Sequence, residues 1–295
     1  MKIAELLGRG RPTISFEFFP PKSEAGVAQL LETIGTLRAL GPAFVSVTYG
    51  AGGSSRTRTV EVVTRIKHEL GIEPLAHVTC IGSTAGELRA LFGELASSGV
   101  ENVMLLRGDR PSDGAPPRAE ELRYATELIA LAAGEFSFSI GAAAYPQVHP
   151  EASSAADDLA NAIRKVAAGA QFLVTQFFFE NEAYFGYVER LRHAGVGVPV
   201  IPGIMPIVSY EGIARMVALS GAPIPAPLQA ALDARRAEPE AIAELGVAYC
   251  ALQCRALLSA GAPGLHFYTL NRSPATRAVV SALVASGVLE ILVPT

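Results

Sequence analysis

Short apolar runs, rich in β-branched and aromatic residues, alternate along the chain with longer stretches of helical periodicity. Eight such runs are expected to be strands, at about 13–19, 43–48, 74–79, 101–106, 136–143, 171–178, 198–204 and 264–269. The stretches between them, among them 28–40, 57–70, 84–98, 120–133 and 154–168, are long enough for the right-handed crossovers of a parallel sheet. The alternation predicts an α/β protein built on one parallel sheet.

A closed (β/α)8 barrel of the TIM type fits this pattern better than an open, doubly wound sheet. The chain has 295 residues, and such barrels typically have about 250. The first strand is not followed by the glycine-rich turn that often marks dinucleotide-binding open sheets. We expect a single catalytic barrel domain over residues 1–295, with an extra helical segment near residues 221–245, where Pro223, Pro225 and Pro227 interrupt the pattern.

Polar side chains stand at the ends of several predicted strands, where the apolar pattern would otherwise continue. In a parallel barrel the C-terminal ends of the strands gather on one face, and the active site is assembled there. One pocket on that face could therefore collect the polar residues at these ends: Glu17, His77, Arg107, Asp109 and Gln176.

Glu17 is the strongest single candidate, because it is a lone carboxylate between Phe16 and Phe18. Strand alternation places it on the opposite face from the two phenylalanines, pointing into the mouth of the barrel. Apolar surroundings raise the pKa of a carboxyl group, so we predict an acid able to donate a proton near neutral pH. The structural alternative is an ion pair with Lys22 or with an arginine.

Two glycine-containing segments suggest contacts with a flat or anionic ligand. Gly108, between Arg107 and Asp109, permits close approach of the backbone to such a ligand. Residues 50–56 could form an anion-binding nest ahead of a helix, with Arg56 assisting. An ordinary surface loop is the alternative in both cases.

Helical spacing and an amide give two further candidates. Asp158, Asn161 and Lys165 share one helix face and could contact a single extended polar ligand, although a solvated, salt-bridged face has the same pattern. Gln176 precedes three phenylalanines, an arrangement suited to holding the edge of a heteroaromatic ring while its face stacks.

Composition excludes several classes of protein. The 24 Lys and Arg against 28 Asp and Glu form no dense basic block, so no nucleic-acid partner is expected. No uninterrupted apolar run approaches about 20 residues, and no signal sequence is visible, which favours a cytoplasmic protein without a membrane partner. Cys250 and Cys254, one helical turn apart, are expected to pack in a core, and no metal site is expected.

Eight short motifs, in this order along the chain, resemble those of the bacterial 5,10-methylenetetrahydrofolate reductase family. They are FEFFPPK (16–22), SVTYG (46–50), HVTC (77–80), LRGD (106–109), YPQVHPE (145–151), TQFFF (175–179), PGIMP (202–206) and HFYTLNR (266–272). Together they extend over nearly the whole chain, so chance is a poor explanation for the resemblance.

The resemblance implies a barrel that holds noncovalent FAD and reduces 5,10-methylenetetrahydrofolate to 5-methyltetrahydrofolate, with hydride passing from NADH or NADPH through the flavin. That reaction belongs to one-carbon metabolism and methionine biosynthesis. The positions that match FAD contacts of the family are Thr48, His77, Arg107, Gly108, Asp109, Tyr145, His149, Asp158, Asn161 and Lys165.

The same resemblance assigns residues to the folate. Glu17 matches the acid that helps to open the one-carbon ring, and Asp109 matches a carboxylate near both flavin and folate. Positions that match folate contacts are Gln176 and Arg272, together with Tyr210, where the family often has a stacking Phe. A homo-oligomer is expected. Two alternatives remain: a non-redox pterin or corrinoid methyltransferase barrel, and a non-catalytic ligand-binding barrel.

Overall fold

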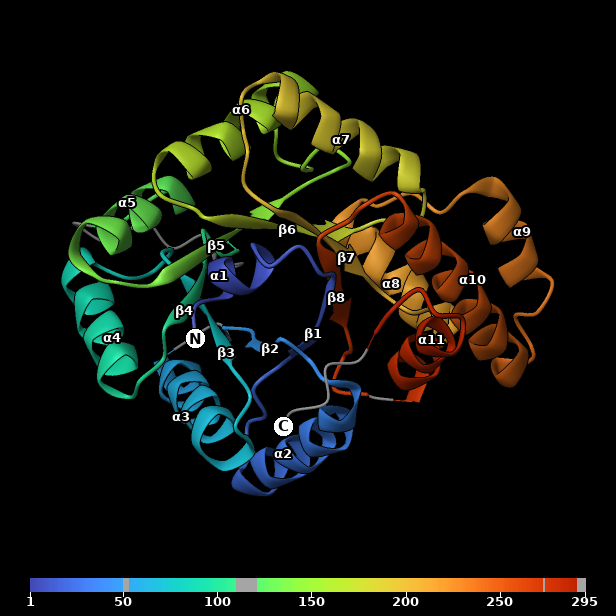
Figure 1. Ribbon diagram of the computed structural model, residues 1–295, viewed down its shortest axis with the longest axis horizontal. Helices are drawn as coiled ribbons and strands as arrows, with labels where there is room; N and C mark the ends of the chain where they lie inside the picture. The colour runs from blue at the N-terminus through green and yellow to red at the C-terminus, as the bar shows by residue number, and fades with distance from the viewer. Residues whose placement is uncertain (50–52, 110–120, 273, 291–295) are drawn as a thin grey trace.

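Eight parallel strands close into a barrel in the computed structural model, in the order of the sequence (Figure 1). The structure describes residues 1–49, 53–109, 121–272 and 274–290, with the backbone alone for residues 53–56. The strands are β1 (Thr13–Phe18), β2 (Phe44–Val47), β3 (Pro74–Thr79), β4 (Asn102–Leu106), β5 (Ser139–Ala144), β6 (Phe172–Phe177), β7 (Val200–Ile204) and β8 (Gly264–Tyr268). The predicted (β/α)8 barrel is confirmed.

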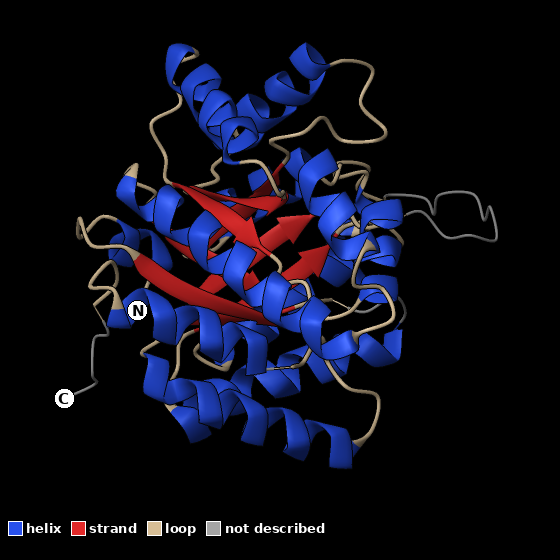
Figure 2. Ribbon diagram, turned by 90° about the vertical axis from the view of Figure 1, so that its right-hand side faces the viewer, coloured by secondary structure: helices blue, strands red, loops and turns tan. Residues whose placement is uncertain are grey.

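Helices enclose the strands on the outside (Figure 2). Within the described residues they are α1 (Ile3–Leu7), α2 (Glu24–Leu37), α3 (Gly53–Leu70), α4 (Ala85–Ser97), α5 (Ala125–Glu135), α6 (Ala155–Ala167), α7 (Asn181–His193), α8 (Tyr210–Ser220), α9 (Ala226–Asp233), α10 (Pro239–Ser259) and α11 (Pro274–Ala285). The strand start that differs most from its prediction is that of β5, and the others begin within two residues of the predicted position. β5 begins at Ser139 rather than near 136, because Phe136 caps the end of α5 and packs with Phe138 against Phe92.

The predicted extra helical segment is present as α9, but its end was placed wrongly. Residues 239–245 belong to the long helix α10, which begins at Pro239. Proline is compatible with the first turn of a helix, where its missing N–H would have no partner anyway. The Pro-rich stretch therefore separates α8 from α9, while Pro239 starts α10 rather than breaking it.

Helix α10, with 21 residues, is long and apolar enough to cross a membrane by length and composition. The sequence contains no uninterrupted apolar run at this helix, because Glu240, Glu244 and Arg255 lie within α10. In the structure α10 packs against β7, α7 and α11 as part of the outer layer of the barrel. Cys250 and Cys254 are buried there as free thiols with their sulfurs 4.0 Å apart, which confirms their packing role.

The short helix α1 closes the N-terminal end of the barrel and lies across its centre in Figure 1. The backbone N–H of Ile3 donates to Asn102 Oδ1 (2.8 Å), and that of Ala4 donates to Ser139 Oγ (3.1 Å), at the starts of β4 and β5. Ile3 and Leu7 pack on the inward-facing apolar side chains of the strands. With this end covered, the C-terminal end of the barrel is the one left for a site.

Candidate active site

Polar side chains from three other strands surround one carboxylate oxygen of Glu17, near the end of β1. Oε2 of Glu17 accepts a hydrogen bond from Ser46 Oγ on β2 (3.3 Å). It lies 3.4 Å from His77 Nε2 on β3 and 3.3 Å from His266 Nε2 on β8. Glu17 is only 9% exposed, and it points into the barrel as predicted. Lys22 is not among its described contacts, so the predicted alternative of an ion pair with Lys22 is wrong, and no described arginine pairs with it either.

The electrostatic surroundings of Glu17 overturn one expectation. Burial raises its pKa, but the hydrogen bond with His266, the charges of His77 and His266, and the Ser46 hydroxyl together lower that pKa below its ordinary 4.5. The predicted rise was wrong because it considered the neighbours in the strand, Phe16 and Phe18, which pack in the outer core. Glu17 is therefore a carboxylate at rest, and it must gain a proton before it can donate one.

His77 is unsuited to carry that proton at neutral pH. Burial lowers its pKa below the ordinary 6.5, and this effect outweighs the negative charge of Glu17, which acts in the opposite direction. His77 is therefore mostly neutral at pH 7, and its place beside Glu17 is that of a polar neighbour.

Sequence reasoning missed three members of this cluster: Ser15, Ser46 and His266. The ring of His266 is 1% exposed, and its Nδ1 lies 2.8 Å from Ser15 Oγ. Strand register aligns Ser15 with His266 and Glu17 with Ser46. Each is a polar residue within an apolar strand, so the alternation that placed Glu17 inward would have placed these inward too.

A second polar cluster begins at Arg107, just after β4. Its guanidinium forms a two-pronged ion pair with Glu151, with Nη1–Oε2 at 2.6 Å and Nη2–Oε1 at 2.9 Å. Glu151 was not among the predicted site residues, although it lies in one of the motifs. Gly108 has φ +86°, and a Cβ there would lie 2.8 Å from Ile81 Cγ2, so only glycine fits this turn. Asp109 follows as an exposed carboxylate.

The loop after β5 and helix α6 complete the second cluster. The rings of Tyr145 and His149 meet edge to face at 4.5 Å. The backbone N–H of His149 donates to Asp158 Oδ2 (3.4 Å), and Lys165 Nζ donates to the carbonyl of Ala143 (2.8 Å). Burial lowers the pKa of Lys165 to about 8 and raises that of Tyr145 to about 12.

Two other predicted cofactor contacts are Asn161 and Thr48. The Oδ1 of Asn161 accepts a hydrogen bond from the neighbouring Arg164 on α6. Thr48, just after β2, forms two hydrogen bonds through its backbone. Its N–H donates to the carbonyl of Phe18 (2.9 Å), and its carbonyl accepts from the Thr59 hydroxyl (3.3 Å). The side chain of Thr48 is half-buried at the C-terminal end of the barrel.

The predicted folate contacts lie near the ends of β6, β7 and β8. Gln176 is half-buried on β6, and its Oε1 accepts from the N–H of Phe177 (3.1 Å). Tyr210 begins α8, where its hydroxyl donates to Asp233 Oδ1 on α9 (2.6 Å) and the guanidinium of Arg236 covers its ring at 4.6 Å. Arg272 is exposed in the loop after β8.

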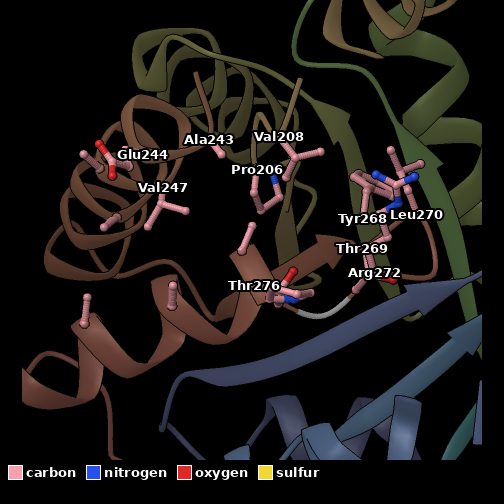
Figure 3. Close-up of a pocket in the computed structure, with 16 residues that line it drawn as sticks. Pro206, Val208, Ala243, Glu244, Val247, Tyr268, Thr269, Leu270, Arg272 and Thr276 are labelled. Carbon is pink, nitrogen blue, oxygen red and sulfur yellow. The ribbon is translucent and has the colours of Figure 1, made fainter. Parts of the chain in front are cut away.

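A cavity of about 680 Å³ lies between α10, α11 and the loops after β7 and β8 (Figure 3). Alanine, valine and proline side chains form most of its wall, and Arg272, Glu244, Thr269 and Thr276 supply polar groups. The hydroxyl of Thr269 donates to the backbone carbonyl of Glu17 (2.6 Å). The cavity therefore adjoins the strand end that carries Glu17.

Two predicted features fall outside the described residues. Of the proposed anion-binding segment 50–56, residues 50–52 are outside, and the side chains of 53–56 are not described. The proline- and glycine-rich loop after β4 is described only as far as Asp109.

The fold and the buried acid–base cluster at the C-terminal ends of its strands define a (β/α)8-barrel enzyme. A family model described as methylenetetrahydrofolate reductase matches residues 2–284. The chain belongs to the methylenetetrahydrofolate reductase family.

Individual relatives agree with this assignment. The chain is 37% identical over 275 residues to the 5,10-methylenetetrahydrofolate reductase of Escherichia coli, covering 93% of this chain and 92% of the relative. It is 36% identical over 281 residues to the Pectobacterium carotovorum enzyme of the same name, covering 95% and 92%. The maize protein named methylenetetrahydrofolate reductase (NADH) 1 is 35% identical over 98% of this chain, which corresponds to 50% of the maize protein.

Solved structures support the fold. A Clostridium thermocellum protein that binds two copies of 5-methyl-5,6,7,8-tetrahydrofolic acid superimposes with a TM-score of 0.63 at 16% identity, covering 96% of this chain and 97% of that one. A Xanthomonas albilineans dihydropteroate synthase gives 0.53 at 14% identity, covering 95% and 94%. At these identities the likeness concerns the barrel alone.

Proposed function

We propose that this protein reduces 5,10-methylenetetrahydrofolate to 5-methyltetrahydrofolate with noncovalently bound FAD and with NADH or NADPH as the electron donor. Family membership supports the reaction, and one observation carries the proposal for this site: the buried carboxylate of Glu17 between His77 and His266 at the barrel mouth. The name of the maize relative favours NADH as the donor. We also propose a single catalytic domain in a cytoplasmic homo-oligomer, without a nucleic-acid or membrane partner.

The second polar cluster fits FAD by the chemistry of its groups. The Lys165 ammonium uses one hydrogen for Ala143, so two remain for a pyrophosphate, and the Arg107 guanidinium lies nearby. The carboxylate of Asp158 can accept from a ribose hydroxyl, and the rings of Tyr145 and His149 offer aromatic surface. Thr48, His77, Gly108, Asp109 and Asn161 are the other proposed contacts. When bound, FAD would supply the hydride carrier that the protein itself lacks.

The residues of the chain would act on the folate by proton transfer and charge. Methylenetetrahydrofolate becomes a good hydride acceptor when its five-membered ring opens to a cationic iminium. Glu17 would deliver a proton to the departing nitrogen. The exposed carboxylate of Asp109 would stabilise the positive charge that develops.

The proposed folate contacts have separate tasks. Gln176 offers an amide to the edge of the pterin, and Tyr210 an aromatic face. Arg272, on the wall of the cavity, suits a carboxylate of the folate tail.

Product analysis tests the proposed function. The purified protein, supplied with FAD and methylenetetrahydrofolate, should form 5-methyltetrahydrofolate with NADH or NADPH, as measured by chromatography, and should form none when FAD has been removed. Methyl transfer without flavin would support the methyltransferase barrel instead. A protein that binds folate but forms no product with either donor would support the non-catalytic barrel.

The affinity for FAD should depend on the charge of Lys165. Because the pKa of Lys165 is about 8, its ammonium is present at pH 7 and largely lost by pH 9.5. FAD should therefore bind about tenfold more weakly at pH 9.5 than at pH 7, the equivalent of about 1.4 kcal/mol. The pKa of Tyr145 is about 12 and that of His149 is lowered below 6.5, so neither titrates in this range. Flavin fluorescence measures the dissociation constant.

The Lys165→Met variant should bind FAD about tenfold more weakly at pH 7 and should lose the pH dependence. Arg255→Met is the matched control, because it removes an exposed cation from α10. An unchanged pH dependence in Lys165→Met would show that another group is responsible.

A further inference from the structure

His266 is fixed on both sides of its ring by buried partners. Its Nδ1 lies 2.8 Å from Ser15 Oγ, and its Nε2 lies 3.3 Å from Glu17 Oε2. The ring stacks on Phe44 at 5.8 Å and meets Tyr268 edge to face at 5.5 Å. Such a ring cannot turn to exchange its two nitrogens without breaking this packing.

The hydrogen bonds around Ser15 determine which nitrogen carries a proton. The Ser15 hydroxyl can donate its one hydrogen to the carbonyl of Leu265 (3.3 Å), and its oxygen then accepts from Nδ1 of His266 (2.8 Å). Nε2 then faces a carboxylate oxygen of Glu17, and two lone pairs facing each other in a buried site are unfavourable. A proton between Nε2 and Oε2 removes this repulsion. The Ser46 hydroxyl, 3.3 Å from Oε2 and 3.4 Å from Nε2, bridges the same two atoms.

We propose that His266 is the positioning residue that stores the proton delivered by Glu17, so that the two side chains act as a single acid anchored by Ser15. This inference rests on the proposed reduction of methylenetetrahydrofolate. At rest the proton is on Nε2, consistent with the lowered pKa of Glu17. As the folate ring opens, the Nε2–H bond breaks and an O–H bond forms on Glu17. That O–H bond then breaks as an N–H bond forms on the departing folate nitrogen, which leaves a neutral imidazole and a carboxylate.

The other titratable groups that face this pair do not compete for its proton near neutral pH. His77, from β3, has a pKa lowered by burial and is mostly neutral. Tyr268, from β8, has a pKa raised well above 10.0 by burial, and its hydroxyl donates to the carbonyl of Thr175 (2.7 Å). From β1 and β2 the polar neighbours are the hydroxyls of Ser15 and Ser46, which do not titrate.

The His266→Gln variant tests the stored proton. A glutamine amide can still donate a hydrogen bond to Glu17 but has no proton to give. With FAD bound, flavin reduction by NADH should stay within twofold of wild type, whereas flavin reoxidation by methylenetetrahydrofolate should slow about 100-fold and lose the pH dependence of wild type. His193→Gln, an exposed histidine on α7, is the matched control and should change neither rate.

Nitrogen NMR of ¹⁵N-histidine-labelled protein tests the same inference without catalysis or the glutamine variant. In wild type, Nδ1 and Nε2 of His266 should both be protonated at pH 7. In Glu17→Gln, the Nε2 resonance of His266 should shift, because its anionic hydrogen-bond partner is gone. Ser15→Ala should shift the Nδ1 resonance of His266 and slow only the folate step.

The outcomes separate the inference from the proposed function. A wild-type protein that does not form 5-methyltetrahydrofolate would overturn the proposed function. If wild type forms it, an unchanged folate step in His266→Gln, or an unprotonated Nδ1 in wild type, would overturn the role of His266 alone. Equal slowing of both half-reactions in a folded His266→Gln protein would make the residue structural and would also overturn that role.

Discussion

The Glu17→Gln variant should keep bound FAD and its reduction by NADH, but should lose the folate half-reaction by about 10²- to 10⁴-fold, the usual contribution of a general acid. Glutamine preserves the shape of the side chain but cannot pass a proton from His266 to the folate. Rapid-mixing absorbance of the flavin measures the two half-reactions separately.

Two controls make the Glu17→Gln result interpretable. Glu32→Gln removes an exposed carboxylate from α2, which accepts a hydrogen bond from Gln29, and should leave both half-reactions unchanged. Thermal unfolding of Glu17→Gln at pH 7 shows whether the barrel is intact, since His77 and His266 lose their anionic partner. Equal damage to both half-reactions would assign Glu17 a structural role and contradict its assignment as the acid.

The Gly246→Ala variant should be severely destabilised, by about 3 kcal/mol or more, because it overpacks a close backbone contact. A Cβ at this position of α10 would lie 1.9 Å from the carbonyl oxygen of Ile207 and 2.8 Å from its carbonyl carbon. Since both contacts are backbone atoms, no side-chain rotation can relieve them. Helix α10 would have to move away from the segment that follows β7, as measured by denaturant unfolding.

Gly93→Ala in α4 is the matched control for Gly246→Ala. Nothing lies within 4 Å of a Cβ at Gly93, and its backbone is helical. Alanine is the better helix former by about 1 kcal/mol, so this variant should be as stable as wild type or slightly more stable. Equal stabilities of the two variants would show that α10 can shift at little cost.

The architecture and the position of Glu17 could be predicted because both depend on local periodicity. A period of two placed Glu17 inward and its phenylalanine neighbours outward, and the alternation of strands with helical stretches gave the barrel. The same local information gave the packing of Cys250 and Cys254 and the extra helix before α10. These features need no knowledge of which distant segments meet.

The pKa of Glu17 could not be predicted in the same way, because its determinants are remote in sequence. His266 is 249 residues away and reaches Glu17 only because β8 closes on β1. Similarly, Glu151 meets Arg107 across 44 residues, and Asp233 meets Tyr210 through the packing of α9 on α8. The space available for a side chain at Gly246 likewise depends on how closely α10 packs against Ile207. Barrel closure and helix packing therefore decide the electrostatics of the site.

An anaerobic absorbance titration of the purified protein tests the central claim most directly. With FAD bound, NADH or NADPH should bleach the flavin bands, and methylenetetrahydrofolate should then restore them with formation of 5-methyltetrahydrofolate. A protein that binds no FAD, or a reduced flavin that methylenetetrahydrofolate leaves bleached, would contradict the proposed reduction.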